Sequence, residues 1–472
     1  MNKKDWGIII LLLLCIFGVW TQQRTRPFIG HDDWDNIIWV SAAKNYQRYG
    51  IIDTKLAQIL NPYPTSDENW VINSHHPPGI SLITYASINA FGDSEFVARM
   101  TPIWASLLAA ALLYRFTRQL YGNEMALLAL FFFGFTPSMV YTSAKIGHEQ
   151  YTLPLMLLSL NLLLRPSHYR QQTLIFIGLA GGIISWAWYL FVGLVGLYSW
   201  RNFKSLKNIQ GLGVGTAISL CLLGILYITQ SDSIAQLWDG FMNRTANTSD
   251  YPVNWVVILN LVTRFFWLPT PVVTLFALLW LRTNKPSLEA IVALTALIYN
   301  AVFWQASLTH DYLLYYLFAP LSIWGALGFH QLLYRYGRPP QRLWGIIHVV
   351  LLGLFLLGSY RWSSRLFAND VIPRRYEWGI QARHATEEGE IIVTNLVASG
   401  PHISYYANRE VLFEKAPEEV FNLEHPLTWG FYIYCVDQGD KPAEQLMEYP
   451  YTIDQNKNII CYLVDLNPDA RP

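Results

Sequence analysis

The sequence predicts an α-helical polytopic membrane protein with about 11 transmembrane helices, interfacial helices in its first outer loop, and a small C-terminal α/β extracytoplasmic domain. Composition is the first reason: of the 472 residues, 53% are hydrophobic and 14% are charged. A typical soluble domain is about 45–50% hydrophobic and about 25% charged. The second reason is a series of long apolar runs, and the third is the placement of basic residues between them. The 33 basic and 33 acidic residues cancel, so we expect no nucleic-acid partner.

The apolar runs define the candidate spans. In chain order they cover residues 6–20, 97–118, 124–144, 149–165, 172–188, 189–200, 209–229, 267–281, 288–306, 311–334 and 342–360. No small-residue cleavage site follows the first run, which predicts an uncleaved first helix. Trp186, Trp188 and Tyr189 near a predicted helix end favour an aromatic belt at the membrane surface.

Lysine and arginine residues orient these spans, because cytoplasmic loops are rich in both. With a cytoplasmic N-terminus, every predicted inner loop is basic. The bases concerned are Lys3, Lys4, Arg115, Arg118, Arg165, Arg170, Arg201, Lys204, Lys207, Arg282, Lys285, Arg335, Arg338 and Arg342. The bases Arg361, Arg365, Arg374 and Arg375, after the last span, go against this pattern. The sequence thus predicts an integral plasma-membrane protein with a cytoplasmic N-terminus and an extracytoplasmic C-terminal domain.

The stretch 78–92 is apolar but too short for a span of about 20 residues. Counting it as a span would also place every later basic cluster outside. We therefore expect an interfacial or re-entrant helix here, within a first outer loop over residues 21–96.

Two domains are expected, a transmembrane domain over residues 1–365 and a polar α/β domain over 366–472. The runs Glu390–Thr394 and Ile459–Val464 predict strands in the second domain. Cys435 and Cys461 also lie there, and the sequence leaves open whether they form a disulfide.

The first unusual polar cluster is the stretch Gly-His-Asp-Asp-Trp-Asp at residues 30–35, just after the first span. Carboxylates at a membrane boundary can bind a divalent cation, and one of them can act as a general base. Taken alone, however, the stretch favours a solvated loop that starts a helix, because Asp33 and Asp35 precede the helix-like run from Asn36.

Other polar residues lie in predicted outer segments as well. His75 and His76 precede two prolines, and they could bind a metal or a phosphate or form a polar lip on a turn. His148 and Glu149 open an apolar helix, where a carboxylate needs a partner, water or the helix dipole. Arg244 is either a partner for an anionic lipid phosphate or an ordinary loop arginine. Because the topology puts all of these on one side of the membrane, we expect one shared site.

The order of these motifs resembles that of the class C membrane glycosyltransferases, in particular the dolichyl-phosphate-mannose protein mannosyltransferase-like group and its aminoarabinose-transferase relatives. The resemblance covers roughly residues 1–165. It rests on the motifs His31-Asp32-Asp33-Trp34-Asp35, Ala43-Lys44-Asn45-Tyr46, Tyr49-Gly50, His75-His76-Pro77-Pro78-Gly79, Phe91 to Arg99, and Gly147-His148-Glu149.

The resemblance implies an inverting transfer of a sugar from a polyprenyl-phosphate donor to a hydroxyl or amine on the extracytoplasmic face. It implies that Asp33 is the base, and that Glu149 and His76 lie near the donor. The family pattern often has Asn at position 35 and His at position 32, so this chain departs from it at both positions.

Two parts of the expected site stay open at this stage. Arg244 is a further candidate for binding the donor phosphate. A divalent cation, magnesium or manganese, would be held by Asp33, Asp35, His148 and Glu149. The acceptor is a glycan, a lipid or a protein, and membrane lipids are the surrounding partner.

Two other functions compete with this interpretation. A transporter or flippase of a lipid-linked saccharide would need polar residues near the middle of several spans. A non-catalytic membrane scaffold would leave the clustered Asp, His and Glu residues without a role. Few ionisable residues lie mid-span, which favours the enzyme.

Overall fold

The computed structural model describes residues 3–22, 24–30, 33–64, 66–165, 169–230, 233–245, 259, 262–263, 270–335, 341–369, 374–396, 399–413, 429–437, 449–456 and 459–466. Contacts divide the chain into two compact units. The first comprises residues 1–25 and 74–369, and the second comprises 26–73 and 370–472. The boundary predicted at residue 365 stays a prediction, but the structure groups much of the first outer loop with the C-terminal region.

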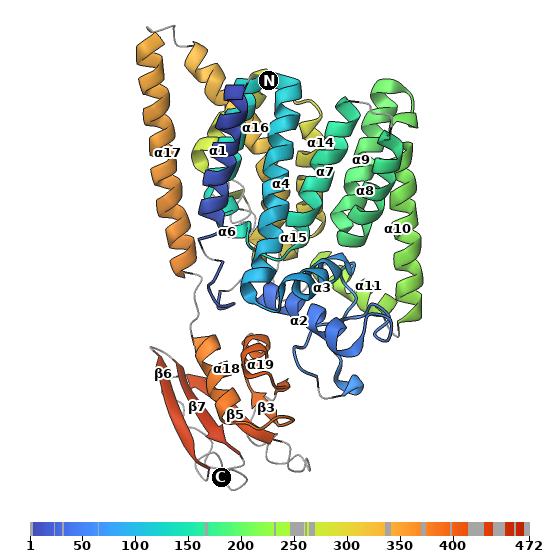
Figure 1. Ribbon diagram of the computed structural model, residues 1–472, viewed down its shortest axis with the longest axis vertical. Helices are drawn as coiled ribbons and strands as arrows, with labels where there is room; N and C mark the ends of the chain where they lie inside the picture. The colour runs from blue at the N-terminus through green and yellow to red at the C-terminus, as the bar shows by residue number, and fades with distance from the viewer. Residues whose placement is uncertain are drawn as a thin grey trace. The chain divides into compact units, whose positions relative to one another are not determined.

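The first unit is helical (Figure 1). Its α-helices are α1 (Lys3–Trp20), α3 (Gly79–Phe91), α4 (Glu95–Tyr121), α5 (Asn123–Phe135), α6 (Pro137–Thr142), α7 (His148–Leu164), α8 (Arg170–Ile184), α9 (Trp186–Phe203), α10 (Gln210–Thr229), α11 (Ser233–Thr245), α13 (Pro271–Thr283), α14 (Glu289–Val302), α15 (Trp304–Thr309), α16 (Tyr315–Arg335) and α17 (Gln341–Asn369). Short 3-10 helices cover Lys207–Ile209 and Asp311–Leu314.

Three stretches within the described residues are long and apolar enough to cross a membrane: Glu95–Tyr121, Lys207–Thr229 and Tyr312–Leu333. Five more apolar helices are shorter, among them Asp5–Trp20 and Gly79–Phe91. The number of about 11 spans therefore stays a prediction. The stretch 78–92 forms a helix of 13 residues, α3, as the sequence indicates.

Two predicted boundaries need correction. The break between the spans 172–188 and 189–200 falls at Ser185, where the backbone is extended and the hydroxyl accepts a hydrogen bond from the backbone N–H of Ala187. This is an ordinary helix N-cap, which hydropathy alone does not reveal. The predicted span 124–144 is likewise divided at Thr136, because Pro137 begins a new helix.

Glycines bring α8 and α10 into close contact. A side-chain carbon at Gly178 would lie 2.5 Å from the carbonyl oxygen of Leu212, and one at Gly215 would lie 2.0 Å from that of Ile175. Small residues of this kind let helix backbones approach each other in membrane proteins. This packing holds the C-terminal end of α8 and the start of α9 in place, and these segments carry part of the candidate active site.

The second unit combines helices with two sheets. Its elements are α2 (Asp33–Tyr49), β1 (Gln58–Ile59), a 3-10 turn (Asp67–Asn69), β2 (Ile72–Asn73), α18 (Arg374–His384), β3 (Ile391–Thr394), α19 (Gly400–Ala407), β4 (Val411–Phe413), β5 (Trp429–Asp437), β6 (Tyr451–Asn456) and β7 (Ile459–Asp465). The larger sheet has the order β4-β3-β5-β7-β6, with β3 parallel to β4 and β5 and with β7 antiparallel to its neighbours.

The two predicted strands and the α/β character of the C-terminal region are confirmed by β3, β7 and the helices α18 and α19. Cys435 on β5 lies directly opposite Cys461 on β7, and the two form a disulfide. The disulfide joins neighbouring strands in the core of this sheet, where Ile433 and Leu463 are also buried.

Candidate active site

A pair of histidines, His75 and His76, lies just before α3 in the first unit. Pro78 precedes α3 directly, and a side-chain carbon at Gly79 would lie 2.7 Å from the carbonyl oxygen of Ile183, so the helix start packs closely against the end of α8. Trp186, the first residue of α9, donates a hydrogen bond from Nε1 to the carbonyl oxygen of His75 at 2.8 Å. The His75–His76 segment is therefore held by the α8–α9 junction.

His76 contacts two other basic side chains. Its ring centroid lies 4.4 Å from that of His148, and Nη1 of Arg244 lies 3.1 Å from its Nε2. His148 in turn donates from Nδ1 to the carbonyl oxygen of Ile184 at 2.6 Å. The segment before α3 and the helices α7 and α11 thus meet in one cationic cluster, made of His76, His148 and Arg244.

The surroundings of His76 keep its imidazole neutral. Burial lowers the pKa of His76 well below the usual 6.5, and the nearby His148 and Arg244 lower it further. Burial and Arg244 also lower the pKa of His75. A neutral His76 that accepts from Arg244 at Nε2 carries its proton on Nδ1. The cluster therefore holds one permanent positive charge, that of Arg244, together with imidazole N–H donors.

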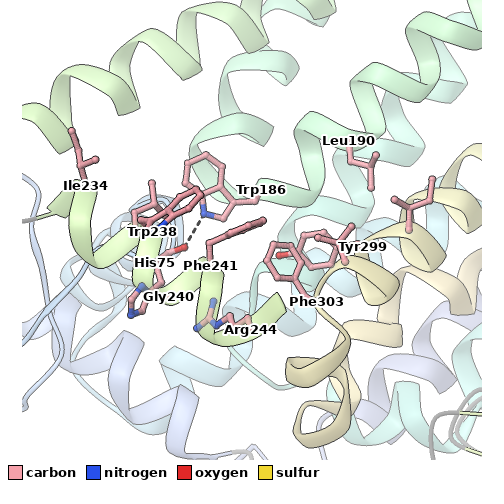
Figure 2. A pocket seen from close by; sticks show the side chains of 13 residues that line it. His75, Trp186, Leu190, Ile234, Trp238, Gly240, Phe241, Arg244, Tyr299 and Phe303 are labelled. Carbon is pink, nitrogen blue, oxygen red and sulfur yellow. Dashed lines mark hydrogen bonds between the residues drawn. The ribbon is translucent and has the colours of Figure 1, made fainter. Parts of the chain in front are cut away.

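A cavity of about 570 Å³ opens beside Arg244 (Figure 2). Its walls come from α9, α11 and α14 and are mainly apolar and aromatic. The lining residues are His75, Trp186, Leu190, Ile234, Leu237, Trp238, Gly240, Phe241, Arg244, Ile298, Tyr299, Val302 and Phe303. An elongated apolar molecule with an anionic end fits such a lining, because only His75 and Arg244 in it are basic.

Helix α11 is amphipathic and forms one wall of the cavity. Ile234, Leu237, Trp238 and Phe241 follow the i, i+3, i+4, i+7 spacing of one helix face. Trp238 is 62% exposed, and Ile234 is exposed as well, which is typical of a helix that lies in the membrane interface. On the side facing α3, a side-chain carbon at Gly240 would lie 2.0 Å from Nδ1 of His75.

Glu149 is buried in the first turn of α7, with 2% of its surface exposed. Gly147 precedes the helix, and a side-chain carbon there would lie 2.8 Å from Oε2 of Glu149. Tyr299 of the cavity wall lies within electrostatic reach of this carboxylate, as do Tyr315 and Tyr316. The position at a helix N-terminus stabilises the negative charge.

Asp33 lies in the second unit, at the start of α2, and is 5% exposed. Its Oδ2 accepts a hydrogen bond from the backbone N–H of Gly30 at 2.9 Å, and its Oδ1 accepts one from Nδ2 of Asn36 at 2.6 Å. Nη2 of Arg26 lies 3.4 Å from the same Oδ2. A buried carboxylate held on both oxygens is oriented as a general base requires. His31 and Asp32 lie outside the described residues.

The described residues do not fit a metal ion. They contain no group of three or more His, Cys, Asp and Glu side chains arranged to hold one. Of the predicted ligands, Asp33 and Asp35 belong to the second unit and His148 and Glu149 to the first. Arginines stand beside Asp33 and His76 instead. The predicted cation stays a prediction.

The structure thus brings together His76 and Arg244, two residues predicted to bind the donor phosphate, and His148, which was predicted as a metal ligand. It also corrects the assignment of Trp188 to a membrane belt. Trp186 lines the cavity, and Trp188 is fully buried and donates to Thr216 of α10. Sequence reasoning missed the wall formed by α11, although its amphipathic spacing could have indicated it.

Comparison with known proteins connects this arrangement to a family. Residues 75–223 match the family model described as dolichyl-phosphate-mannose-protein mannosyltransferase. The comparison with curated proteins found no match. The matched residues run from the histidine pair, just before α3, into α10, and they include Glu149.

Solved structures share the fold. ArnT from Cupriavidus metallidurans bound to undecaprenyl phosphate has a TM-score of 0.70 at 11% identity, over 98% of both chains. An oligosaccharyltransferase from Archaeoglobus fulgidus in complex with Zn and sulfate has a TM-score of 0.52 at 12% identity, over 90% of this chain and 67% of that one. The same organism's AglB, with an inhibitory peptide and a dolichol-phosphate, has a TM-score of 0.50 at 11% identity, over 92% and 70%.

The identities are too low to carry residue roles across, so these structures establish the fold. They show that this chain has the class C glycosyltransferase fold, and part of it, residues 75–223, is similar to the mannosyltransferase family model.

Proposed function

We propose that this protein is an inverting glycosyltransferase that moves a sugar from a polyprenyl-phosphate donor to an acceptor hydroxyl or amine on the extracytoplasmic face. The observation that carries the proposal is the aromatic cavity that ends at Arg244 and His75. Its lining suits an isoprenoid chain, and its basic end suits a phosphate. The lipid phosphates bound by ArnT and AglB support the same donor class.

The leaving group is stabilised by the cationic cluster. When the bond between the sugar and the phosphate breaks, negative charge grows on the lipid phosphate. Arg244 and the Nδ1 proton of neutral His76 stabilise that charge, because both are already oriented by their hydrogen bond. Glu149 is proposed to bind the hydroxyl groups of the donor sugar, since its carboxylate is an acceptor near the tyrosine of the cavity wall.

Asp33 is proposed as the catalytic base. Its carboxylate takes the proton of the acceptor while the acceptor oxygen or nitrogen attacks the anomeric carbon. One displacement inverts that carbon and releases the polyprenyl phosphate. A positioned base of this kind contributes about 10²–10⁴-fold. The hydrogen bonds from Gly30 and Asn36 fix the carboxylate for this role.

The experiment uses membranes that contain the protein and a panel of polyprenyl-phosphate sugars, with donor consumption and product configuration as readouts. We expect one donor to be consumed only in the presence of the active protein, with an inverted anomeric centre in the product. A retained configuration would contradict the single displacement. Movement of intact donor across the bilayer without bond cleavage would favour the transporter instead.

A further inference from the structure

The C-terminal region of the chain holds the segment that leads into Asp33. Within the second unit, α19 packs against α2. The hydroxyl oxygen of Tyr406 on α19 accepts a hydrogen bond from the backbone N–H of Phe28 at 2.6 Å. The ring of Phe28 lies edge-on to the ring of Tyr405 at 5.9 Å, and Nζ of Lys44 on α2 lies 4.4 Å from the centre of that same ring.

These contacts are buried. Phe28 is fully buried, and Tyr405 and Tyr406 are buried as well. A buried backbone N–H needs an acceptor, so the hydroxyl of Tyr406 satisfies a group that would otherwise be costly. The rings of Tyr376 and Tyr405 pack edge-on against the Tyr406 ring at 4.8 Å and 5.1 Å. The ring that carries this hydroxyl is therefore held by side chains of the C-terminal domain.

The Phe28 peptide, which Tyr406 holds, lies close to Asp33 in the sequence. Gly30, two residues after Phe28, donates its N–H to Oδ2 of Asp33 at 2.9 Å. The N–H of Asp33 in turn donates to the carbonyl oxygen of Gly30 at 3.2 Å. A shift of Phe28 moves Gly30, and with it one of the donors that orient the carboxylate.

We propose that Tyr406 is a positioning residue for Asp33, and that the C-terminal domain thereby sets the geometry of the base. The inference rests on the proposed function, in which Asp33 takes the acceptor proton. Tyr406 acts through the Phe28 peptide and does not touch the substrate. A misplacement of about 1 Å can cost up to about 10²-fold in rate, so one distant hydrogen bond can control turnover.

The test compares Tyr406→Phe with Tyr451→Phe in the full-length protein. The first variant keeps the ring and removes the acceptor of the Phe28 N–H. The second makes the same change on β6, where the ring is 40% exposed and contacts Tyr462. For each protein, kcat, the KM for the polyprenyl-phosphate donor and the melting temperature in detergent are measured.

We expect Tyr406→Phe to lower kcat about 10-fold, with a donor KM close to that of Tyr451→Phe. Its melting temperature should be lower than that of the control, because the buried N–H of Phe28 loses its acceptor. A kcat within twofold of that control would overturn the inference. A loss of kcat accompanied by a raised donor KM would also overturn it, because that pattern indicates a general structural role. Asp33→Asn is measured in the same assay. Full activity in Asp33→Asn would refute Asp33 as the base, whereas an unchanged kcat in Tyr406→Phe alone would refute only the positioning role of Tyr406.

Discussion

Arg244 on α11 donates a hydrogen bond from Nη1 to Nε2 of His76, which precedes α3, over 3.1 Å. The two residues are 168 positions apart in the chain, and their contact joins the cavity to the histidine pair. Because arginine is always charged, it fixes His76 as the acceptor and leaves the guanidinium with further N–H donors for an anion.

Arg244→Ala should weaken donor binding. A hydrogen bond to a charged group contributes about 1.5–3 kcal/mol, so we expect the donor KM to rise about 10–10²-fold. Arg201→Ala, an exposed arginine on α9, is the matched control and should leave the KM unchanged. Steady-state kinetics with a polyprenyl-phosphate sugar decide the point. Equal KM values for the two variants would remove Arg244 from the donor site.

Gly240→Ala should disturb the histidine pair through sterics alone. The added carbon would lie 2.0 Å from Nδ1 of His75, so that side chain must move. The control is Gly224→Ala on α10, where nothing lies within 4 Å of the new carbon. Both changes favour a helix by about 1 kcal/mol, so helix propensity is matched. We expect kcat/KM to fall about 10-fold for Gly240→Ala only, which corresponds to about 1.4 kcal/mol. A Gly240→Ala variant as active as the control would show that the contact is unimportant.

Leu190→Trp should fill part of the cavity and discriminate donors by chain length. Leu190 lines the cavity from α9, whereas Leu197 on the same helix is 63% exposed. We expect Leu190→Trp to lose activity with long-chain donors and to lose much less with a short, water-soluble prenyl-phosphate sugar. Leu197→Trp should treat both donors as the wild type does. Equal losses with both donors for Leu190→Trp would argue that the cavity does not hold the lipid chain.

Acidification should destabilise the protein through His76. Its pKa in the folded protein lies below the usual 6.5, mainly because of burial and then because of His148 and Arg244. The unfolded chain therefore binds more protons below about pH 6.5, and folding stability falls as the pH drops through that window. We expect the melting temperature of donor-free protein to fall less between pH 7 and pH 5 in His76→Gln than in the wild type. The lowered pKa of His75 contributes to both proteins equally. An identical fall in the two proteins would mean that His76 does not titrate there.

Local sequence signals were sufficient for several features. The prolines after His76 and the short apolar run 78–92 predicted α3, and the short apolar runs at 390–394 and 459–464 predicted β3 and β7. His76 and Arg244 were both candidates for a phosphate site, and the structure brings them into contact. The helix and the strands depend on neighbouring residues in the chain, and the two candidate residues stand out as basic groups in a chain with few charges. A sequence displays both signals directly.

Other features depend on contacts between distant segments, which no local pattern encodes. The sequence does not show that the indole N–H of Trp186 reaches the carbonyl oxygen of His75, 111 positions away. The hydrogen bond between Phe28 and Tyr406 spans 378 positions and could not be predicted either. The N-cap at Ser185 was missed because it lies inside a continuous apolar run.

Purified Asp33→Asn tests the central claim most directly, when donor binding and sugar transfer are measured on the same sample. Asp67→Asn, an exposed carboxylate of the same segment, is the control. We predict that Asp33→Asn binds the polyprenyl-phosphate sugar as tightly as the control but transfers sugar about 10²–10⁴-fold more slowly. Transfer at the rate of the Asp67→Asn control would contradict the assignment of Asp33 as the base.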